Sequence, residues 1–154
     1  MNFENLLAPN AVKVLSSTTS KKRLVTELGD LAATAYGLEA TTVVEALLAR
    51  EALGPTGVGR GVALPHARLA GLDKVVGLFV LLDKPVDFGA VDRQPVDIAF
   101  ALFAPENAGV DHLKALALVS RTLRDSGVCA KLRANPSANT LYTILTEAEG
   151  AQAA

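Results

Sequence analysis

Two nearly continuous apolar runs constrain most strongly what this chain can fold into. One covers residues 75–82 and reads VVGLFVLL; the other covers residues 96–103 and reads VDIAFALF. Both are rich in branched side chains and flanked by proline or charge, which is typical of strands that are covered on both faces. We therefore predict two buried central strands, with only a short strand or turn between them over residues 85–92.

Helical patterns precede these runs. The first predicted helix begins after a Ser20 N-cap and ends at Gly37. Its apolar residues recur at helical spacing: Leu24, Leu28, Leu31 and Ala35. A second helix is predicted from Thr42 and Glu45, which have capping-box spacing, to Gly54-Pro55. Its buried face is expected to consist of Val43, Val44, Leu47 and Leu48.

Further elements complete an α/β pattern. Residues 62–68 are expected to be extended, with a strand end or an edge at Pro65, which cannot donate a ladder hydrogen bond. Asp111 is the expected N-cap of a helix that runs to about residue 125, and shorter helices are expected near 128–134 and 138–147. Residues 1–154 are thus predicted to form a single α/β domain, with a mixed, mainly central sheet of about five strands flanked by helices and a frayed tail at 150–154.

Composition excludes several classes of function. A net charge of -1 and 5% aromatic residues give no basic stripe and few stacking platforms, so nucleic acid is not an expected partner. No apolar run approaches the length of a membrane span and no signal-peptide pattern is present, so we expect a cytoplasmic protein without membrane insertion. Cys129 is the only cysteine, and we expect a small buried apolar side chain in a reducing compartment.

A glycine-rich segment carries the candidate chemistry. Residues 54–66 read GPTGVGRGVALPH, and glycines let a backbone approach an anion closely with its N–H groups exposed. No Lys-Ser or Lys-Thr pair follows, so this is not a nucleotide-binding Walker loop. The candidate phosphate-binding residues are Thr56, Gly57, Val58 and Gly59.

His66 follows this segment and is the candidate nucleophile. An accessible imidazole close to backbone donors suits a phosphoryl acceptor. The structural alternative is a histidine that packs or caps an edge strand. Since the preceding loop is rich in glycine, we favour the phosphoacceptor.

Three further residues have both a functional and a structural interpretation. His112 shares a predicted helix face with apolar residues and should point inward, either as a buried histidine or as a donor to a phosphoryl group. Arg50 either complements the end of its helix or neutralises phosphoryl charge. Arg60 could also neutralise phosphoryl charge, although a solvated loop arginine is the favoured description.

A metal site is not favoured, because two distant histidines lack an obvious third ligand, and no cofactor is expected.

At these residues the chain resembles the enzyme IIA domains of the fructose/mannitol class of the bacterial phosphoenolpyruvate-dependent phosphotransferase system, especially its nitrogen-regulatory members. The resemblance covers nearly the whole chain. The residues that match the family pattern are Arg50-Glu51, residues 56–59, residues 61–66, Asp87-Phe88, residues 94–97 and His112-Leu113. Pro55 and Arg60 depart from the pattern: the first removes a potential hydroxyl ligand, and the second adds positive charge.

The resemblance implies a phosphorelay role. It implies that His66 accepts a phosphoryl group from an HPr-like histidine phosphocarrier, with His112, Arg50 and the loop from Thr56 holding the phosphoryl oxygens. It further implies regulation of partners such as sensor kinases or potassium transporters according to phosphorylation state. Two alternatives remain: a IIA component that passes phosphate to a separate sugar-specific IIB protein, and a binding module that works independently of phosphorylation.

Overall fold

The two apolar runs form the centre of a sheet. In the computed structural model, which describes residues 1–153 and their side chains through residue 148, the runs lie in β5 (Val76–Val86) and β6 (Val96–Pro105). The two strands pair antiparallel, with Val76 opposite Phe103 and Leu81 opposite Ile98. Every residue of β6 except Asp97 is buried, so the prediction of central strands covered on both faces is confirmed.

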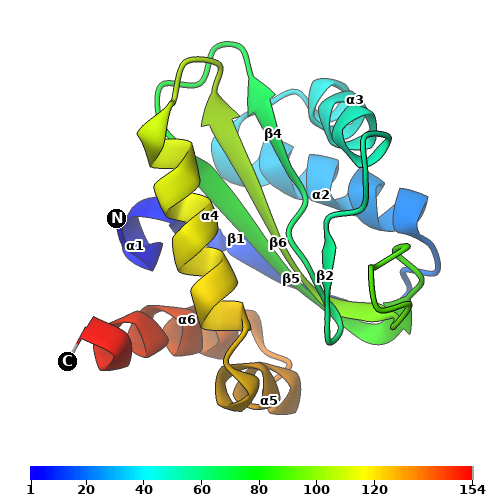
Figure 1. Ribbon diagram of the computed structural model, residues 1–154, viewed down its shortest axis with the longest axis vertical. Helices are drawn as coiled ribbons and strands as arrows, with labels where there is room; N and C mark the ends of the chain where they lie inside the picture. The colour runs from blue at the N-terminus through cyan, green and yellow to red at the C-terminus, as the bar shows by residue number, and fades with distance from the viewer. Residues whose placement is uncertain (154) are drawn as a thin grey trace.

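The sheet is mixed and has six strands. Its order is β1-β5-β6-β3-β2, with β4 also beside β6 (Figure 1). The other strands are β1 (Leu7–Leu15), β2 (Gly57–Gly59), β3 (Val62–Ala63) and β4 (His66–Leu69). β1 is parallel to β5, β3 and β4 are parallel to β6, and β2 is antiparallel to β3. The predicted α/β class is confirmed, with six strands instead of about five.

The predicted extended segment of residues 62–68 is divided into β3 and β4. The two short strands follow one another along β6, and Leu64-Pro65 lies between them. Pro65 has no N–H to donate, but its carbonyl still accepts a hydrogen bond of 2.9 Å from the Leu102 N–H. The proline therefore ends β3 without separating the chain from β6, and His66 opens the next strand.

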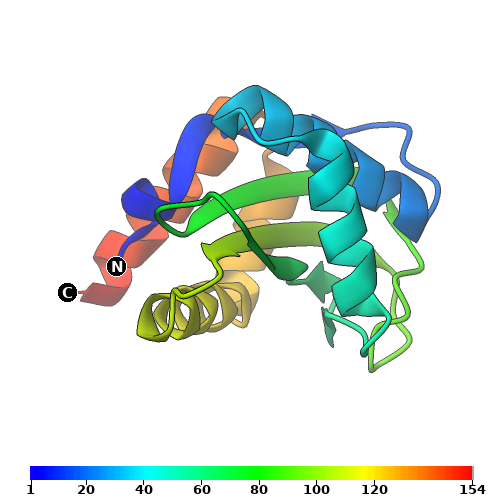
Figure 2. The same cartoon turned by 90° about the horizontal axis from the view of Figure 1, so that it is seen from above.

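Two helices cover one face of the sheet, α2 (Lys21–Tyr36) and α3 (Ala40–Glu51), as Figure 2 shows. The predicted caps of α2 are confirmed: the Ser20 side chain accepts a hydrogen bond from the Arg23 N–H, and Gly37 is left-handed with φ 68°. The predicted N-cap of α3 at Thr42 is wrong, because this helix begins at Ala40 after Glu39. Leu48, expected in the core, is 36% exposed.

Close packing between α2 and α3 accounts for the early start of α3. A Cβ atom on Gly29 would lie 2.6 Å from Cγ2 of Val44 and 2.9 Å from the carbonyl oxygen of Ala40. Only three residues connect the helices, so α3 has to begin at Ala40 for its first turn to pack against Gly29. Tertiary contact here overrides the capping pattern at Thr42.

The other face carries α4 (Val110–Leu123), α5 (Ser126–Ala134) and α6 (Ala138–Ala153). The predicted N-cap of α4 at Asp111 is wrong by two residues: Gly109 is the cap, with φ 55°, and Asp111 lies in the first turn. A glycine tolerates this positive φ, which lets the chain enter the helix early. The prediction of a frayed tail falls on residues 150–154, whose side chains lie outside the described part of the chain.

Three aromatic side chains meet within the otherwise mainly aliphatic core. Phe3, in the short helix α1 (Phe3–Leu6), and Phe79 both pack against the Phe100 ring, with ring centroids 5.6 and 6.2 Å from it. All three rings are 0% exposed. Cys129 is buried, as predicted, and burial raises the pKa of its thiol. This core holds β5 and β6 in place, and β1, β3 and β4 pair with these two.

Candidate functional site

A hollow of about 590 Å³ lies between α3, β4 and the start of α4. It is lined by Ala46, Ala49, Arg50, Leu53, His66, Ala67, Arg68, His112, Leu113 and Leu116. Three of the residues singled out from the sequence, His66, His112 and Arg50, therefore meet at one place although they come from three separate elements. The lining contains two arginines, two histidines and no carboxylate, so its charge favours an anion.

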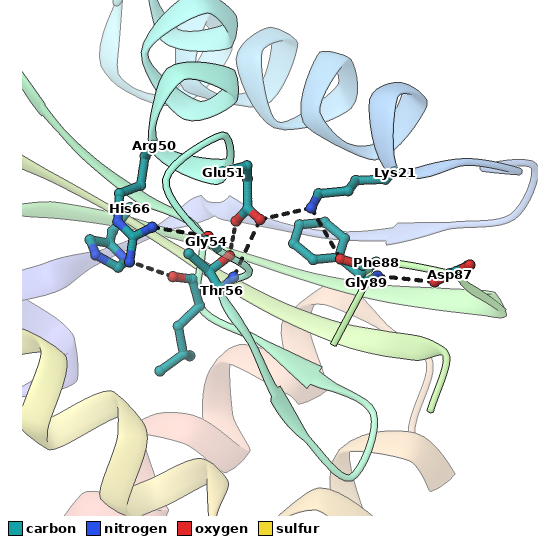
Figure 3. Close-up of polar contacts among 10 residues, drawn as sticks. Lys21, Arg50, Glu51, Gly54, Thr56, His66, Asp87, Phe88 and Gly89 are labelled. Atoms are coloured by element: carbon teal, nitrogen blue, oxygen red, sulfur yellow. Dashed lines mark hydrogen bonds and ion pairs between the residues drawn. The ribbon is translucent and has the colours of Figure 1, made fainter. Parts of the chain in front are cut away.

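His66 has a defined tautomer in this hollow. Its Nδ1 lies 2.8 Å from the carbonyl oxygen of Leu64 (Figure 3). Since a carbonyl oxygen only accepts, Nδ1 must carry the proton and donate it. In a neutral ring the Nε2 atom then holds a free lone pair, and the ring is half-buried rather than enclosed. The strand break at Leu64-Pro65 thus presents a nucleophilic nitrogen.

His112 lies beside His66 and is almost fully buried. The two rings meet edge to face with centroids 5.7 Å apart, and His112 is 6% exposed. Its Nε2 atom is buried without a hydrogen-bond partner in the described structure. Burial lowers the pKa of His112, and the neighbouring His66 and Arg68 lower it further. An acceptor oxygen placed in the hollow would give this nitrogen the partner it lacks.

The lowered pKa of His112 predicts a stability effect on the acid side. Between about 6.5, the ordinary histidine pKa, and the lower folded value, the unfolded chain binds a proton that the folded chain does not. The free energy of unfolding should therefore be fully maintained above that window and fall as the pH drops through it. Urea denaturation across this range should show a shallower fall for His112→Gln, and an unchanged fall would contradict the prediction.

Two arginines supply positive charge. Arg50, at the end of α3, donates from Nη1 to the Gly54 carbonyl at 3.0 Å. Arg68 lines the hollow two residues after His66 and donates to the Glu106 carbonyl at 2.8 Å. Arg68 was not predicted from the sequence as a site residue, although side chains at i and i+2 share one face of a strand and its spacing from His66 could have indicated it.

The structure does not bring the glycine-rich segment into the hollow. Thr56 is 4% exposed, and its hydroxyl donates to Glu51. Gly57 packs so closely that an added Cβ would lie 2.7 Å from the Cβ of Ala90. Val58 and Gly59 line a different hollow, next to α4. None of these four residues is among those that line the hollow at His66, so their role as phosphate ligands stays a prediction.

Arg60 lies at the tip of the hairpin that joins β2 to β3. Arg60 and Gly61 have φ angles of 58° and 80°, as in the two-residue turns that suit the twist of a hairpin. The Arg60 N–H donates to Asp92 at 2.8 Å, and Arg133 donates to the Arg60 carbonyl at 2.8 Å. These contacts secure the backbone of the tip, and the exposed Arg60 side chain lies outside the hollow of the histidines.

No helix within the described residues has both the length and the apolar character to cross a membrane. Among the same residues, no group of three or more histidine, cysteine, aspartate or glutamate side chains is placed to hold a metal ion.

Comparison with known proteins identifies the family. Residues 5–148 match the model of the phosphoenolpyruvate-dependent sugar phosphotransferase system, EIIA 2. The chain belongs to this EIIA 2 family. The match includes strand β4, which carries His66, and helix α4, which carries His112, and it confirms the resemblance found in the sequence.

Similar proteins place this EIIA 2 chain among nitrogen-regulatory relatives. It is 48% identical to a nitrogen regulatory protein of Bradyrhizobium diazoefficiens, over 94% of this chain and 95% of the relative. A nitrogen regulatory protein of Klebsiella oxytoca is 41% identical, over 96% and 92% of the two chains. The crystal structure of nitrogen regulatory protein IIA-Ntr from Neisseria meningitidis superposes with a TM-score of 0.84 at 38% identity, covering 92% of this EIIA 2 chain and 97% of the other.

Proposed function

We propose that this protein is a phosphohistidine carrier that accepts a phosphoryl group on Nε2 of His66. The observation that carries the proposal is the hydrogen bond from Nδ1 of His66 to the Leu64 carbonyl, which leaves the Nε2 lone pair free. His112, Arg50 and Arg68 line the same hollow and supply donors and positive charge for phosphoryl oxygens. Membership in the EIIA 2 family supports this chemistry.

The proposed donor is the phosphohistidine of an HPr-like carrier. The Nε2 lone pair of His66 forms a new P–N bond while the P–N bond of the donor breaks, and its electron pair returns to the donor's imidazole. His66 keeps its Nδ1 proton, which the Leu64 carbonyl holds. The transfer needs no metal or nucleotide at this site, so positioning and charge stabilisation are the available catalytic means.

The surroundings of the hollow suit a docking partner. Leu53 and Leu113, two of its lining residues, are 83% and 66% exposed, and Val110 at the start of α4 is 61% exposed. Exposed apolar side chains around a charged hollow are typical of a protein interaction surface. A carrier that presents its phosphohistidine within an apolar patch would fit, and the proposed place of action is the cytoplasm, where such carriers are charged.

Regulation follows from the change in charge. A phosphoryl group adds about -1.5 to -2 units of charge at neutral pH to a hollow that is otherwise positive, which can break or create docking. The names of the nitrogen-regulatory relatives support a regulatory role, and the partners proposed here, sensor kinases or potassium transporters, are those that the family resemblance implies. Transfer to a separate sugar-specific IIB protein is the second candidate, because a fructose-specific EIIA component of Haloferax volcanii is 36% identical over 68% of this chain.

Intact mass spectrometry tests the proposal. The purified protein is incubated with enzyme I, an HPr-like carrier and phosphoenolpyruvate, and the expected result is a mass gain of one phosphoryl group that maps to His66. Nitrogen-15 NMR should then place the phosphoryl group on Nε2, because Nδ1 is the protonated donor. The proposal fails if the protein gains no mass while a control acceptor does, or if the group maps to another residue.

The same samples distinguish the candidate roles. Onward transfer to a IIB protein would appear as loss of the label when a sugar-specific IIB is added. A regulatory role would appear as partner proteins that are captured by only one of the two phosphorylation states. Identical capture in both states would favour the phosphorylation-independent binding module.

A further inference from the structure

An ion pair with a buried carboxylate and a half-buried ammonium lies next to Arg50. The Glu51 carboxylate, whose side chain is 5% exposed, accepts from the Lys21 ammonium at 2.8 Å (Figure 3). It also accepts from the hydroxyl of Thr56 and from the Thr56 N–H. A carboxylate removed from water is costly unless it is paired and hydrogen-bonded, and Glu51 is both. These contacts join the end of α3 to the start of α2 and to the turn that follows α3.

The location of Lys21 is unfavourable for its own helix. It is the first residue of α2, where the helix dipole is positive and disfavours a cation. Its ammonium is held by Glu51, by the Phe88 carbonyl at 3.1 Å and by the Phe88 ring, whose centroid is 4.5 Å away. The interaction with Glu51 and Phe88, rather than the stability of α2, accounts for a lysine at this position.

The turn after α3 is held from two sides. Glu51 follows Arg50 directly, and successive helix residues point about 100° apart, so the two side chains leave the helix in different directions. Glu51 holds Thr56 at the far end of the turn, while Arg50 donates to the Gly54 carbonyl in the middle of it. The position of that carbonyl therefore sets the direction of the Arg50 guanidinium.

We infer that Glu51, held by Lys21, is a positioning residue for Arg50. By fixing Thr56 it fixes the turn, and the Gly54 carbonyl of that turn holds the guanidinium at the edge of the hollow that contains His66. The inference rests on the proposed function, since it concerns the approach of a phosphoryl group to His66. A charged donor that is already oriented costs no reorganisation when the group is transferred.

This inference gives Thr56 a different role from the one implied by the family resemblance. Its hydroxyl is used by Glu51, and the residue is 4% exposed. Thr56 therefore acts on the phosphoryl group only through the turn. Thr56→Ser, which keeps the hydroxyl, should transfer phosphate at the wild-type rate, while Thr56→Val should be slowed in the same way as Glu51→Gln.

Rapid-quench measurement of phosphoryl transfer to His66 tests the inference. Glu51→Gln should lower the rate constant about tenfold. Replacing Arg50 itself should cause a larger loss, on the order of 10²-fold. Glu45→Gln, an exposed carboxylate on the same helix, is the matched control and should transfer at the wild-type rate. The decisive comparison is made in Arg50→Gln protein. There, Glu51→Gln should cause no further loss, because its effect passes through Arg50.

A multiplicative loss in the double variant would overturn the inference, because it would show that Glu51 acts independently of Arg50. Nitrogen-15 NMR of the Arg50 guanidinium gives a second reading that needs no phosphate. Restricted rotation should be observed in wild type and lost in Glu51→Gln, and unchanged spectra would also overturn the inference. If wild type accepts no phosphoryl group, the proposed function fails and the NMR comparison alone decides the positioning role.

Lys21→Met provides a second variant if Glu51→Gln does not fold. It removes the ammonium while keeping the length of the side chain, and it should lower the transfer rate and free the Arg50 guanidinium in the same way. Lys22→Gln, at the exposed neighbouring position, is its control. Wild-type behaviour of Lys21→Met in both measurements would contradict the role given to Lys21.

Discussion

A His66→Ala variant is expected to take up no phosphoryl group from a charged HPr-like carrier. The variant lacks the nitrogen whose lone pair is left free by the hydrogen bond to Leu64. Nothing else in the hollow replaces it: His112 is 6% exposed, which makes it poorly accessible as a second acceptor. Intact mass after incubation with carrier and phosphoenolpyruvate measures the result.

His112→Gln is the informative comparison for His66→Ala. This variant keeps the nucleophile but loses the imidazole whose Nε2 atom has no partner in the described structure. Uptake should continue at a rate lowered on the order of 10²–10³-fold, the usual cost of losing one oriented donor. A His66→Ala protein that is phosphorylated to the wild-type yield would refute the assignment of the acceptor. Complete loss in His112→Gln with full uptake in His66→Ala would exchange the two roles.

Phe100→Ala is expected to have the largest effect on stability. The ring is 0% exposed and packs edge to face against Phe3 and Phe79. The ring also lies against Gly77, where an added Cβ would be 2.6 Å from it. Replacing a buried phenylalanine with alanine costs about 3–5 kcal/mol, a large part of the total of about 5–15 kcal/mol for a domain. Urea denaturation monitored by circular dichroism measures the change.

Val91→Ala is the control for this substitution. Val91 is 72% exposed, so its truncation should change the free energy of unfolding by less than about 0.5 kcal/mol. If Phe100→Ala were equally mild, the aromatic cluster would not be the centre of the core. The slope of the free energy of unfolding against urea concentration should stay similar in both variants, since neither substitution changes by much the surface exposed on unfolding.

The sequence predicted those parts of the fold that depend on local pattern. The runs that became β5 and β6 contain too many consecutive apolar residues for an exposed strand, and Ser20 and Gly37 mark the ends of α2 by well-known capping chemistry. The inward direction of His112 also followed from helical spacing, and the structure buries it. In each case the residues that decide the outcome are close together in the chain.

The incorrect prediction of the start of α3 involves a contact between distant segments. Thr42 has the pattern of a helix start, but the approach of Gly29 to Ala40 begins α3 earlier. The phosphate-binding role of the glycines at 57 and 59 stays a prediction, and the structure shows a packing reason for both: Gly57 accommodates Ala90, and an added Cβ on Gly59 would lie 3.2 Å from a carboxylate oxygen of Asp92. A glycine that makes room for a backbone or a side chain cannot be distinguished by sequence from one that makes room for a phosphate.

The candidate site was only partly predictable for the same reason. His66, His112 and Arg50 were each identified by residue type and position, and the structure brings them to one hollow. The ion pair between Glu51 and Lys21 was not predicted, because the two residues are thirty positions apart and a lysine near other basic residues suggests a solvated surface. The available signal was a cation in the first turn of a helix, where the dipole disfavours it.

The central place of β6 determines when the histidine site can exist during synthesis. In the described sheet β4 pairs with β6 alone, so the strand that His66 opens has no partner until residues 96–105 have left the ribosome. His112 is made shortly after β6, because α4 is the next element in the chain. Such long-range pairing forms late in folding. A nascent or truncated chain that lacks β6 would therefore carry His66 without its surroundings. Under the proposed function, such a chain is expected not to accept phosphoryl groups from the carrier.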